Sequence, residues 1–189
     1  MNKLLDARQH IYDWFHASLA MQSHFLQPAQ EDPYAAYYTS MYLIQDTGEA
    51  VCAHMQADFS TKPMQAYIEF WGVMQAIFIQ QEAMRELHSA VVGNKLNTRH
   101  LPNWNAIREK RNLCSGHPSN QSHRRPAPQR AFMGRGFGNY KEIRYEVWDA
   151  QTHTATHPTF DLGSLICAYE TEAEKILLDI LADMKQRWP

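Results

Sequence analysis

The sequence has few cysteines and few glycines. Its 189 residues include only Cys52, Cys114 and Cys167, which are widely spaced and odd in number. This set argues against a disulfide framework and favours a reducing compartment. Glycine contributes 8 residues and proline 9, while 44% of the chain is hydrophobic. We therefore expect a globular chain rather than a disordered one.

A large net charge and a long apolar run are also missing. The formal net charge is −2, so any surface that binds nucleic acid must be local. The densest apolar patch, AIFI at 76–79, is too short to span a membrane, and the charged segment 1–15 does not resemble a signal peptide. We expect a single cytoplasmic domain over the whole length, with enough residues for a hydrophobic core.

Apolar residues recur at spacings of three and four along most of the chain, which is the pattern of helices that bury one face. Short connections between such helices favour antiparallel neighbours. The pattern predicts five helices, at about 4–26, 33–59, 63–92, 104–116 and 161–184.

Local signals mark several helix ends. Asp32 is predicted to cap the second helix, with Pro33 at its first helical position. Gly93 is a good stop for the longest helix. Gly48 lies on an apolar face, where a glycine indicates a kink or close packing.

The composition changes to turn-forming residues between about 117 and 160. The segment 140–150 alternates Ile143, Tyr145 and Val147 on one face and is the clearest strand. We expect the flanking segments RAFMGRGF and HTATHPTF to pair with it. The predicted fold class is therefore mainly α: an up-and-down antiparallel helical bundle, with a basic loop and a small antiparallel β insertion before the last helix.

The segment EKRNLCSGHPSN, residues 109–120, ends the predicted fourth helix. Arg111 lies in its last turns and His117 just beyond it, so both side chains can point into one pocket. An arginine there can hold a phosphate with two hydrogen bonds, and a histidine can move a proton near neutral pH. Asn112 can orient the phosphate or the imidazole. Together these residues suit metal-independent RNA cleavage, in which the 2′-hydroxyl is the nucleophile.

The same residues also fit an ordinary helix end. Gly116 suits a left-handed position, Pro118 follows soon after, and cationic side chains complement the helix dipole. Short spacings between arginine and histidine also arise by chance. Spacing alone leaves both interpretations open.

The preceding helix carries polar residues among large apolar ones. Folding the helical hairpin about residue 97 places these polar residues opposite Arg111. We therefore expect Gln81, Glu82 and Arg85 at the same pocket, with Glu82 holding Arg111, because a buried arginine needs a partner. A surface pair of Glu82 and Arg85 that contributes little is the alternative.

The segments QQEAMRELH and AIREKRNLCSGHP, with the short connection between them, resemble the HEPN domain, a helical family of prokaryotes and eukaryotes. Its signature is an arginine, a polar residue that is often asparagine, and a histidine four to six residues after the arginine. Arg111, Asn112 and His117 match this signature in residue type, spacing and helix position. The resemblance covers about residues 60–120 and the helical plan, and the β insertion matches no part of it.

The resemblance implies a metal-independent endoribonuclease, frequently a toxin of toxin–antitoxin, phage-defence or abortive-infection systems. It implies a homodimer whose two motifs form one cleft, an antitoxin protein as partner, and no cofactor. Arg111 would bind the scissile phosphate, His117 would act as general acid or base, and Asn112 would position the substrate. Ser119 stands where members controlled by a nucleotidyltransferase carry the tyrosine that receives AMP, which argues against that control.

Basic residues cluster after the motif, where Glu142 is the one acid between 121 and 144. The residues expected to contact an RNA backbone are Arg124, Arg125, Arg130 and Arg135. The aromatic residues expected to stack on bases are Phe132, Phe137 and Tyr140. A solvated loop that balances acidic helices is the alternative.

The sequence thus predicts a HEPN-type endoribonuclease that acts on RNA without a metal and leaves a 2′,3′-cyclic phosphate. Two other classes of function stay open. One is a catalytically inactive helical domain that binds a nucleotide or a protein partner. The other is a regulatory domain whose basic loop binds nucleic acid without cutting it.

Overall fold

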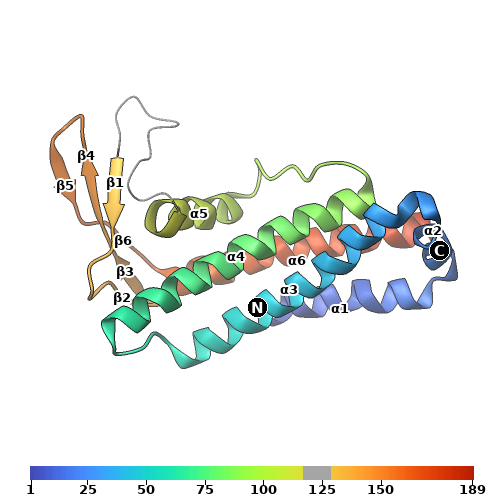
Figure 1. Ribbon diagram of the computed structural model, residues 1–189, viewed down its shortest axis with the longest axis horizontal. Helices are drawn as coiled ribbons and strands as arrows, with labels where there is room; N and C mark the ends of the chain where they lie inside the picture. Colours follow the sequence, from blue (N-terminus) through green and yellow to red (C-terminus); the bar gives the residue numbers. More distant parts are fainter. Residues whose placement is uncertain (117–128) are drawn as a thin grey trace.

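The structure, a computed structural model, describes residues 1–116 and 129–189, so the expectations for His117, Arg124 and Arg125 lie outside the described residues. The described parts form a bundle of long helices with a β region at one end (Figure 1). The expected mainly α fold class is confirmed. None of the described helices combines the length and the hydropathy needed to span a membrane. The helical elements are α1 (Asn2–Ala17), α2 (Leu19–Phe25), η1 (Pro28–Gln30), α3 (Glu31–Ala57), α4 (Pro63–Val92), α5 (Pro102–Arg111), η2 (Asn112–Gly116) and α6 (Leu162–Arg187).

The helices α1, α3, α4, α5 and α6 alternate in direction along the chain (Figure 1). The helix α3 packs along α4, α1 packs against α3 and α6, and α4 also contacts α6. The shorter α5 lies against α6 and α4. The helix α5, which ends at Arg111, therefore packs on the side of a four-helix bundle formed by α1, α3, α4 and α6.

Two helix starts differ from the expectation. The first expected helix is broken at Ser18, whose hydroxyl accepts a hydrogen bond from the backbone N–H three residues on (3.2 Å) and caps α2. Gln30 is the N-cap of α3, which begins at Glu31, so Asp32 is not the cap and Pro33 is the third helical residue. The two acidic side chains still suit the first turn, because they face the positive end of the helix dipole.

Other helix limits are confirmed. The helix α4 ends before Gly93, whose φ of 81° lies in the left-handed region. Asp161 caps α6 by accepting a hydrogen bond from the backbone N–H three residues on (2.7 Å). Gly48 provides close packing, because a Cβ there would lie 2.8 Å from Cδ2 of Leu5 in α1.

A buried polar network joins three helices of the bundle. The amide oxygen of Gln80, in α4, accepts a hydrogen bond from the Tyr169 hydroxyl of α6 (2.9 Å). Its amide nitrogen donates to Oγ1 of Thr47 in α3 (3.3 Å). Gln80 is fully buried, so these partners offset the cost of removing its amide from water.

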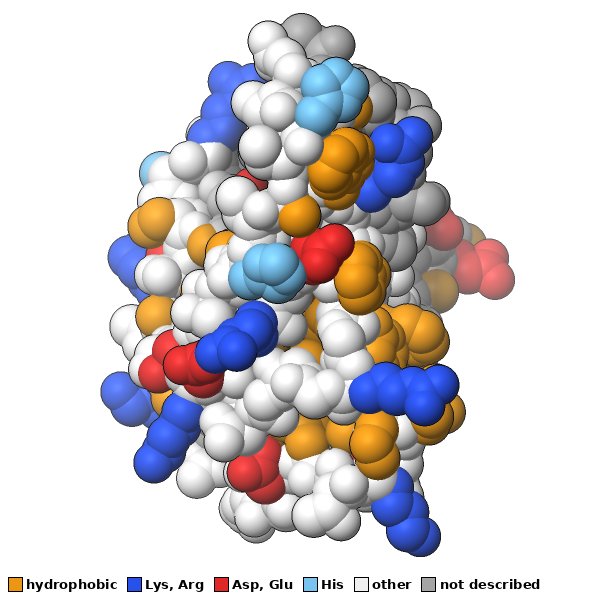
Figure 2. Space-filling model, turned by 90° about the vertical axis from the view of Figure 1, so that its left-hand side faces the viewer, with side chains coloured by type: hydrophobic (Ala, Val, Ile, Leu, Met, Phe, Trp, Pro, Cys, Tyr) orange, Lys and Arg blue, Asp and Glu red, His pale blue; other side chains and the backbone are white. Residues whose placement is uncertain are grey.

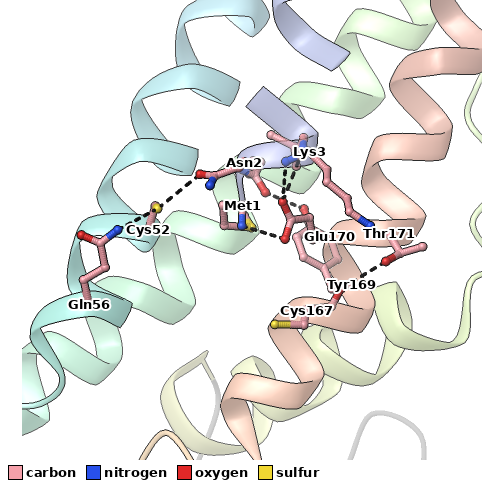
Figure 3. Close-up of polar contacts among 11 residues, drawn as sticks. Met1, Asn2, Lys3, Cys52, Gln56, Cys167, Tyr169, Glu170 and Thr171 are labelled. Carbon is pink, nitrogen blue, oxygen red and sulfur yellow. Dashed lines mark hydrogen bonds and ion pairs between the residues drawn. The ribbon is translucent and has the colours of Figure 1, made fainter. Parts of the chain in front are cut away.

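A carboxylate on α6 fixes the start of α1 (Figure 3). Oε2 of Glu170 lies 2.7 Å from the amino group of Met1. Oε1 of Glu170 accepts hydrogen bonds from the backbone N–H groups of Lys3 (2.9 Å) and Leu4 (3.5 Å). These are N–H groups of the first turn, which an α-helix leaves without an internal partner. Glu170 therefore caps α1 from a neighbouring helix.

Within the described residues, the β region forms two three-stranded antiparallel sheets. Sheet A has the order β1-β4-β5 and sheet B the order β2-β3-β6. The strands are β1 (Gln129–Phe132), β2 (Gly138–Asn139), β3 (Glu142–Arg144), β4 (Glu146–Asp149), β5 (Thr154–Thr156) and β6 (Thr159–Phe160).

The expected strand at 140–150 is interrupted at Tyr145, where the chain passes from sheet B to sheet A. The backbone N–H of Tyr145 donates to the carbonyl of Pro158 (3.2 Å). Ile143 and Tyr145 are buried and Val147 is half-buried, so the alternation identified the inward face correctly. The expected pairing of both flanking segments is confirmed, in two sheets rather than one.

Candidate active site

The motif helix α5 begins on a carboxylate of α6. Glu172 accepts hydrogen bonds from the backbone N–H of Trp104 (2.7 Å) and from that of the residue before it (3.0 Å). The side chains of Trp104 and Ile107 are buried in the bundle. Residues three apart lie on the same side of a helix, so Arg108 and Arg111 share the edge of α5 that meets α4.

The Arg111 side chain crosses from α5 to α4. Its Nη2 donates to Oε1 of Gln75 (2.9 Å), and its Nη1 donates to Oδ1 of Asn112 (3.1 Å). Its guanidinium carbon lies 4.2 Å from the centroid of the Phe78 ring, which is a cation–π contact. Because a guanidinium group has five N–H donors, these two bonds orient its plane and leave donors for a ligand.

A second arginine shares the same aromatic ring. The guanidinium carbon of Arg108 lies 4.6 Å from the Phe78 centroid. Burial lowers the pKa of Arg111, and the charge of Arg108 lowers it further. Arg111 still stays charged near neutral pH, because the ordinary pKa of arginine lies far above it. The charge of Arg108 is offset by Glu82, so within the described residues the guanidinium group of Arg111 is the one placed to attract an anion.

The chain leaves α5 through the π-helical turn η2 rather than as a continued α-helix. A Cβ at Gly116 would lie 2.7 Å from Nη1 and 3.2 Å from Cζ of Arg111. Gly116 is not among the glycines with positive φ, which are Gly93 and Gly138 in the described residues. The expected left-handed helix stop is therefore wrong, and the glycine serves the close approach of a guanidinium group. Turns of this kind are frequent at functional sites.

Glu82 pairs with Arg108 and not with Arg111, which was the expected partner. Its Oε1 lies 2.5 Å from Nη1 of Arg108, whereas Arg111 lies opposite Gln75, about two turns nearer the start of α4. The connection 93–101 explains this shift. An extended residue advances about 3.3 Å and a helical one about 1.5 Å, so the connection carries α5 farther back along α4.

Two other residues expected at the pocket hold the hairpin together. Gln81 is buried, and its amide nitrogen donates to the carbonyl of Trp104 (3.0 Å). Arg85 donates to Oγ1 of Thr98 (3.3 Å) and lies 3.8 Å from Oε1 of Glu82. These contacts fix the position of α5 on α4.

A groove of about 520 Å³ runs between α3 and α4 beside the two arginines. Ala35, Thr39 and Leu43 line it from α3. Phe78 and Glu82 line it from α4, so these two residues face the groove as well as the arginines. Asp32 and Glu86 also line the groove, so its mainly apolar surface suits an uncharged ring or sugar and not a second phosphate.

The other side of α5 is attached to the β region. Nζ of Lys110 donates to the hydroxyl of Tyr145 (3.0 Å) and lies 5.3 Å from the centroid of the Phe160 ring. The turn η2 packs against β1. Its Cys114 is buried, and burial raises the pKa of the thiol to about 12, so Cys114 is no nucleophile near neutral pH.

The basic residues expected to bind RNA are described in part. Arg130 on β1 and Arg135 in the connection after it are exposed. Arg124 and Arg125 lie outside the described residues, as does His117. Whether these last three reach Arg111 stays a prediction.

The aromatic residues expected to stack on bases divide into two groups. Phe132 is exposed, whereas Phe137 and Tyr140 are buried. The rings of Phe137 and Tyr140 lie 5.4 Å and 4.7 Å from that of Phe59, at the junction of the β region and the bundle. The expectation that these two rings stack on RNA is therefore wrong, because they belong to the core.

Sequence reasoning missed the contacts made by Arg108, Gln75 and Phe78. The signal for Arg108 was present, since it precedes Arg111 by one helical turn. Gln75 and Phe78 became site residues only through the register of α5 on α4.

Comparison with known proteins identifies no relative of this chain. No family model matches the chain, and no curated protein or solved structure matches it significantly. Within residues 1–116 and 129–189, no three His, Cys, Asp or Glu side chains form a group that could hold a metal ion. Any function assigned to the chain therefore depends on the geometry around Arg111 and on its motif.

Proposed function

We propose that this protein is a metal-independent endoribonuclease of the HEPN type. The observation that carries the proposal is the Arg111 guanidinium group, which is stacked on Phe78. Gln75 and Asn112 orient this group, and His117 comes directly after the turn η2 in the sequence. A guanidinium group held in this way beside a second arginine suits a phosphate diester. The neighbouring groove offers space for the attached sugar or base.

In the proposed reaction, the 2′-oxygen of a ribose bonds to the adjacent phosphorus as the bond from phosphorus to the 5′-oxygen breaks. Arg111 binds the non-bridging oxygens and stabilises the charge that builds up on them. His117 takes the proton of the 2′-hydroxyl or gives a proton to the leaving 5′-oxygen. The products are a 2′,3′-cyclic phosphate and a 5′-hydroxyl.

A homodimer belongs to this proposal, because two copies would supply one histidine as base and one as acid. The helices α3 and α4 expose large apolar side chains, as interfaces between subunits do. These side chains are Tyr38, Tyr42, Leu43, Ile68 and Trp71. Light scattering on the purified protein tests this point: a mass of two chains supports it, and a mass of one chain contradicts it.

The first test is incubation of the purified protein with total and synthetic RNA in EDTA, beside Arg111→Ala and His117→Ala. We expect the wild type to cleave and both variants to lose about 100-fold or more in rate. The matched controls are Arg99→Ala and His10→Ala, which remove exposed residues of the same types and should cleave like the wild type. Mass spectrometry should find cyclic phosphate ends.

Absence of cleavage by the wild type, across several RNAs near neutral pH, would contradict the proposal. It would favour a helical domain that binds a nucleotide, nucleic acid or protein partner without chemistry. One observation favours this second function: Arg108 and Arg111 already have protein partners in Glu82 and Gln75, as residues that only pack would. Equal cleavage by the wild type and both variants would indicate a contaminant or another site.

The proposed role as a toxin or phage-defence protein has its own test. Induced expression in a bacterial host should arrest growth with the wild type and permit growth with His117→Ala. Co-expression of a candidate antitoxin protein should restore growth. Normal growth on expression of the wild type would contradict the toxin role and would leave the proposed ribonuclease activity untouched.

A further inference from the structure

Sheet A carries aromatic and basic side chains on its outer face. On β1, Arg130 and Phe132 are exposed, whereas Ala131 is buried. Side chains alternate between the two faces of a strand, so Arg130 and Phe132 point the same way. Trp148 of β4 lies on that face too, because the register pairs it directly with Arg130.

The two aromatic rings are well exposed, Phe132 to 55% and Trp148 to 37%. Phe132 is paired with Glu146, two residues before Trp148, so the two aromatic residues are diagonal neighbours across β1 and β4. Diagonal positions lie about 7–8 Å apart, within reach of large rings. Figure 2 views this end of the molecule, where hydrophobic, basic, acidic and histidine side chains are all exposed. Two exposed rings side by side on one face form a candidate surface for ligand binding.

One guanidinium group on this face can contact an anionic ligand. Arg130 forms no ion pair within the described residues. Glu146 lies on the same face, where its carboxylate is 3.0 Å from Nε2 of His157. A guanidinium group beside two rings combines a contact for phosphate with surfaces for stacking.

The strand that carries Arg130 and Phe132 lies next to the turn that follows Arg111. The turn η2, which follows Arg111, packs against β1. Lys110 binds the hydroxyl of Tyr145, the residue between β3 and β4. An RNA strand bound at Arg111 would therefore lie close to sheet A.

We propose that the outer face of sheet A binds unpaired bases of a single RNA strand, which stack on Phe132 and Trp148 while Arg130 contacts the backbone. The inference rests on the proposed function for its substrate class and adds that the bound RNA is single-stranded. Bases in a duplex are stacked on one another and cannot use the platform. Stacking depends little on base identity, because every base has a π-face.

The test is the binding of a fluorescently labelled, unstructured RNA whose 2′-hydroxyls are all methylated, so that attack by the 2′-oxygen is blocked. Fluorescence anisotropy at one fixed salt concentration measures the affinity. We expect Phe132→Ala and Trp148→Ala each to weaken binding by about tenfold or more. The matched control Tyr12→Ala removes a ring of 41% exposure on α1 and should bind like the wild type.

Two further comparisons separate stacking from stability and from charge. Phe132→Leu and Trp148→Leu keep apolar volume on the strands but lose the flat ring, and they should weaken binding as the alanine variants do. The same RNA annealed to its complement should bind more weakly to the wild type. Removal of either ring should leave that duplex affinity unchanged.

Unchanged single-strand affinity in both alanine variants would overturn the inference. If these variants instead dissociate a dimer, the face is a protein interface, which also overturns it. Cleavage that requires Arg111, with RNA binding that does not depend on Phe132 and Trp148, would support the ribonuclease and contradict RNA binding by sheet A. Single-strand binding that requires both rings, without cleavage by the wild type, would retain the platform and remove the ribonuclease.

Discussion

Lys110 and Arg111 are adjacent in the sequence, yet they attach the end of α5 to different parts of the molecule. Nζ of Lys110 donates to the Tyr145 hydroxyl in the β region at 3.0 Å. Nη2 of Arg111 donates to Oε1 of Gln75 in the bundle at 2.9 Å. Successive helical residues point about 100° apart, so one helix end can bind two partners on different sides. The position of the candidate phosphate site relative to sheet A depends on both contacts.

We expect Lys110→Met to loosen the β region without unfolding the bundle. The change removes the hydrogen bond to Tyr145, which contributes about 1 kcal/mol. Hydrogen exchange in the strands should become faster, while exchange in α3 and α4 should not change. The control Lys175→Met breaks an exposed pair with Asp179 and should change neither. Wild-type exchange in the strands of Lys110→Met would show that the contact does not hold the β region.

Gly116→Ala should reduce cleavage by about tenfold or more, because the new Cβ displaces the Arg111 guanidinium group from its observed position. Gly72→Ala is the matched control, since a Cβ there would meet no atom within 4 Å. It should cleave like the wild type and gain about 0.5–1 kcal/mol of stability, because glycine is unfavourable inside a helix. Wild-type cleavage by Gly116→Ala would mean that the observed guanidinium position is not needed.

Glu82→Gln separates the observed arrangement from the sequence-based expectation. Because Glu82 pairs with Arg108, the variant should still cleave RNA and should bind it more tightly at low salt, where the unpaired guanidinium charge counts most. The stability cost should stay below about 1 kcal/mol, since the Glu82 side chain is 44% exposed. Glu49→Gln, an exposed change on α3, is the control. A loss of cleavage as large as that of Arg111→Ala would restore Glu82 as the holder of Arg111.

The parts of the fold that could be predicted are those set by neighbouring residues. Gly93 and Asp161 mark helix ends through their own backbone or side chain, so the sequence shows them. The interruption at Tyr145 could not be predicted, because alternation shows which side chains are buried and not which sheet the strand belongs to. A change of sheet depends on the partners that other strands offer.

The candidate site divides in the same way. Arg111 and Asn112 could be identified together because they are adjacent in the motif. The contact between Arg111 and Gln75 depends on the path of the connection and on the burial of Trp104. These are tertiary features, and an error of one to two turns in register assigns the wrong partner, as the expected pair of Glu82 and Arg111 shows.

The buried thiol of η2 tests whether this turn keeps its structure in solution. Burial raises the pKa of Cys114 from 9.0 to about 12, which disfavours the reactive thiolate in the folded protein. At about pH 8 we expect iodoacetamide to label the exposed Cys167, while Cys114 reacts only after denaturation. Mass spectrometry of the digested protein measures both. Equal labelling of the two residues in the folded protein would mean that η2 opens readily.

The same pKa shift predicts how stability depends on pH. Because the folded-state pKa of Cys114 is raised, the stability that the protonated thiol contributes is fully present below pH 9.0 and is lost as the pH rises towards 12. Cys114→Ala removes this titration. Its free energy of unfolding, measured with urea, should therefore fall less steeply above pH 9.0 than that of the wild type. Parallel pH profiles for the two proteins would show that the thiol is not buried as observed, and the packing of η2 against β1 would have to be revised.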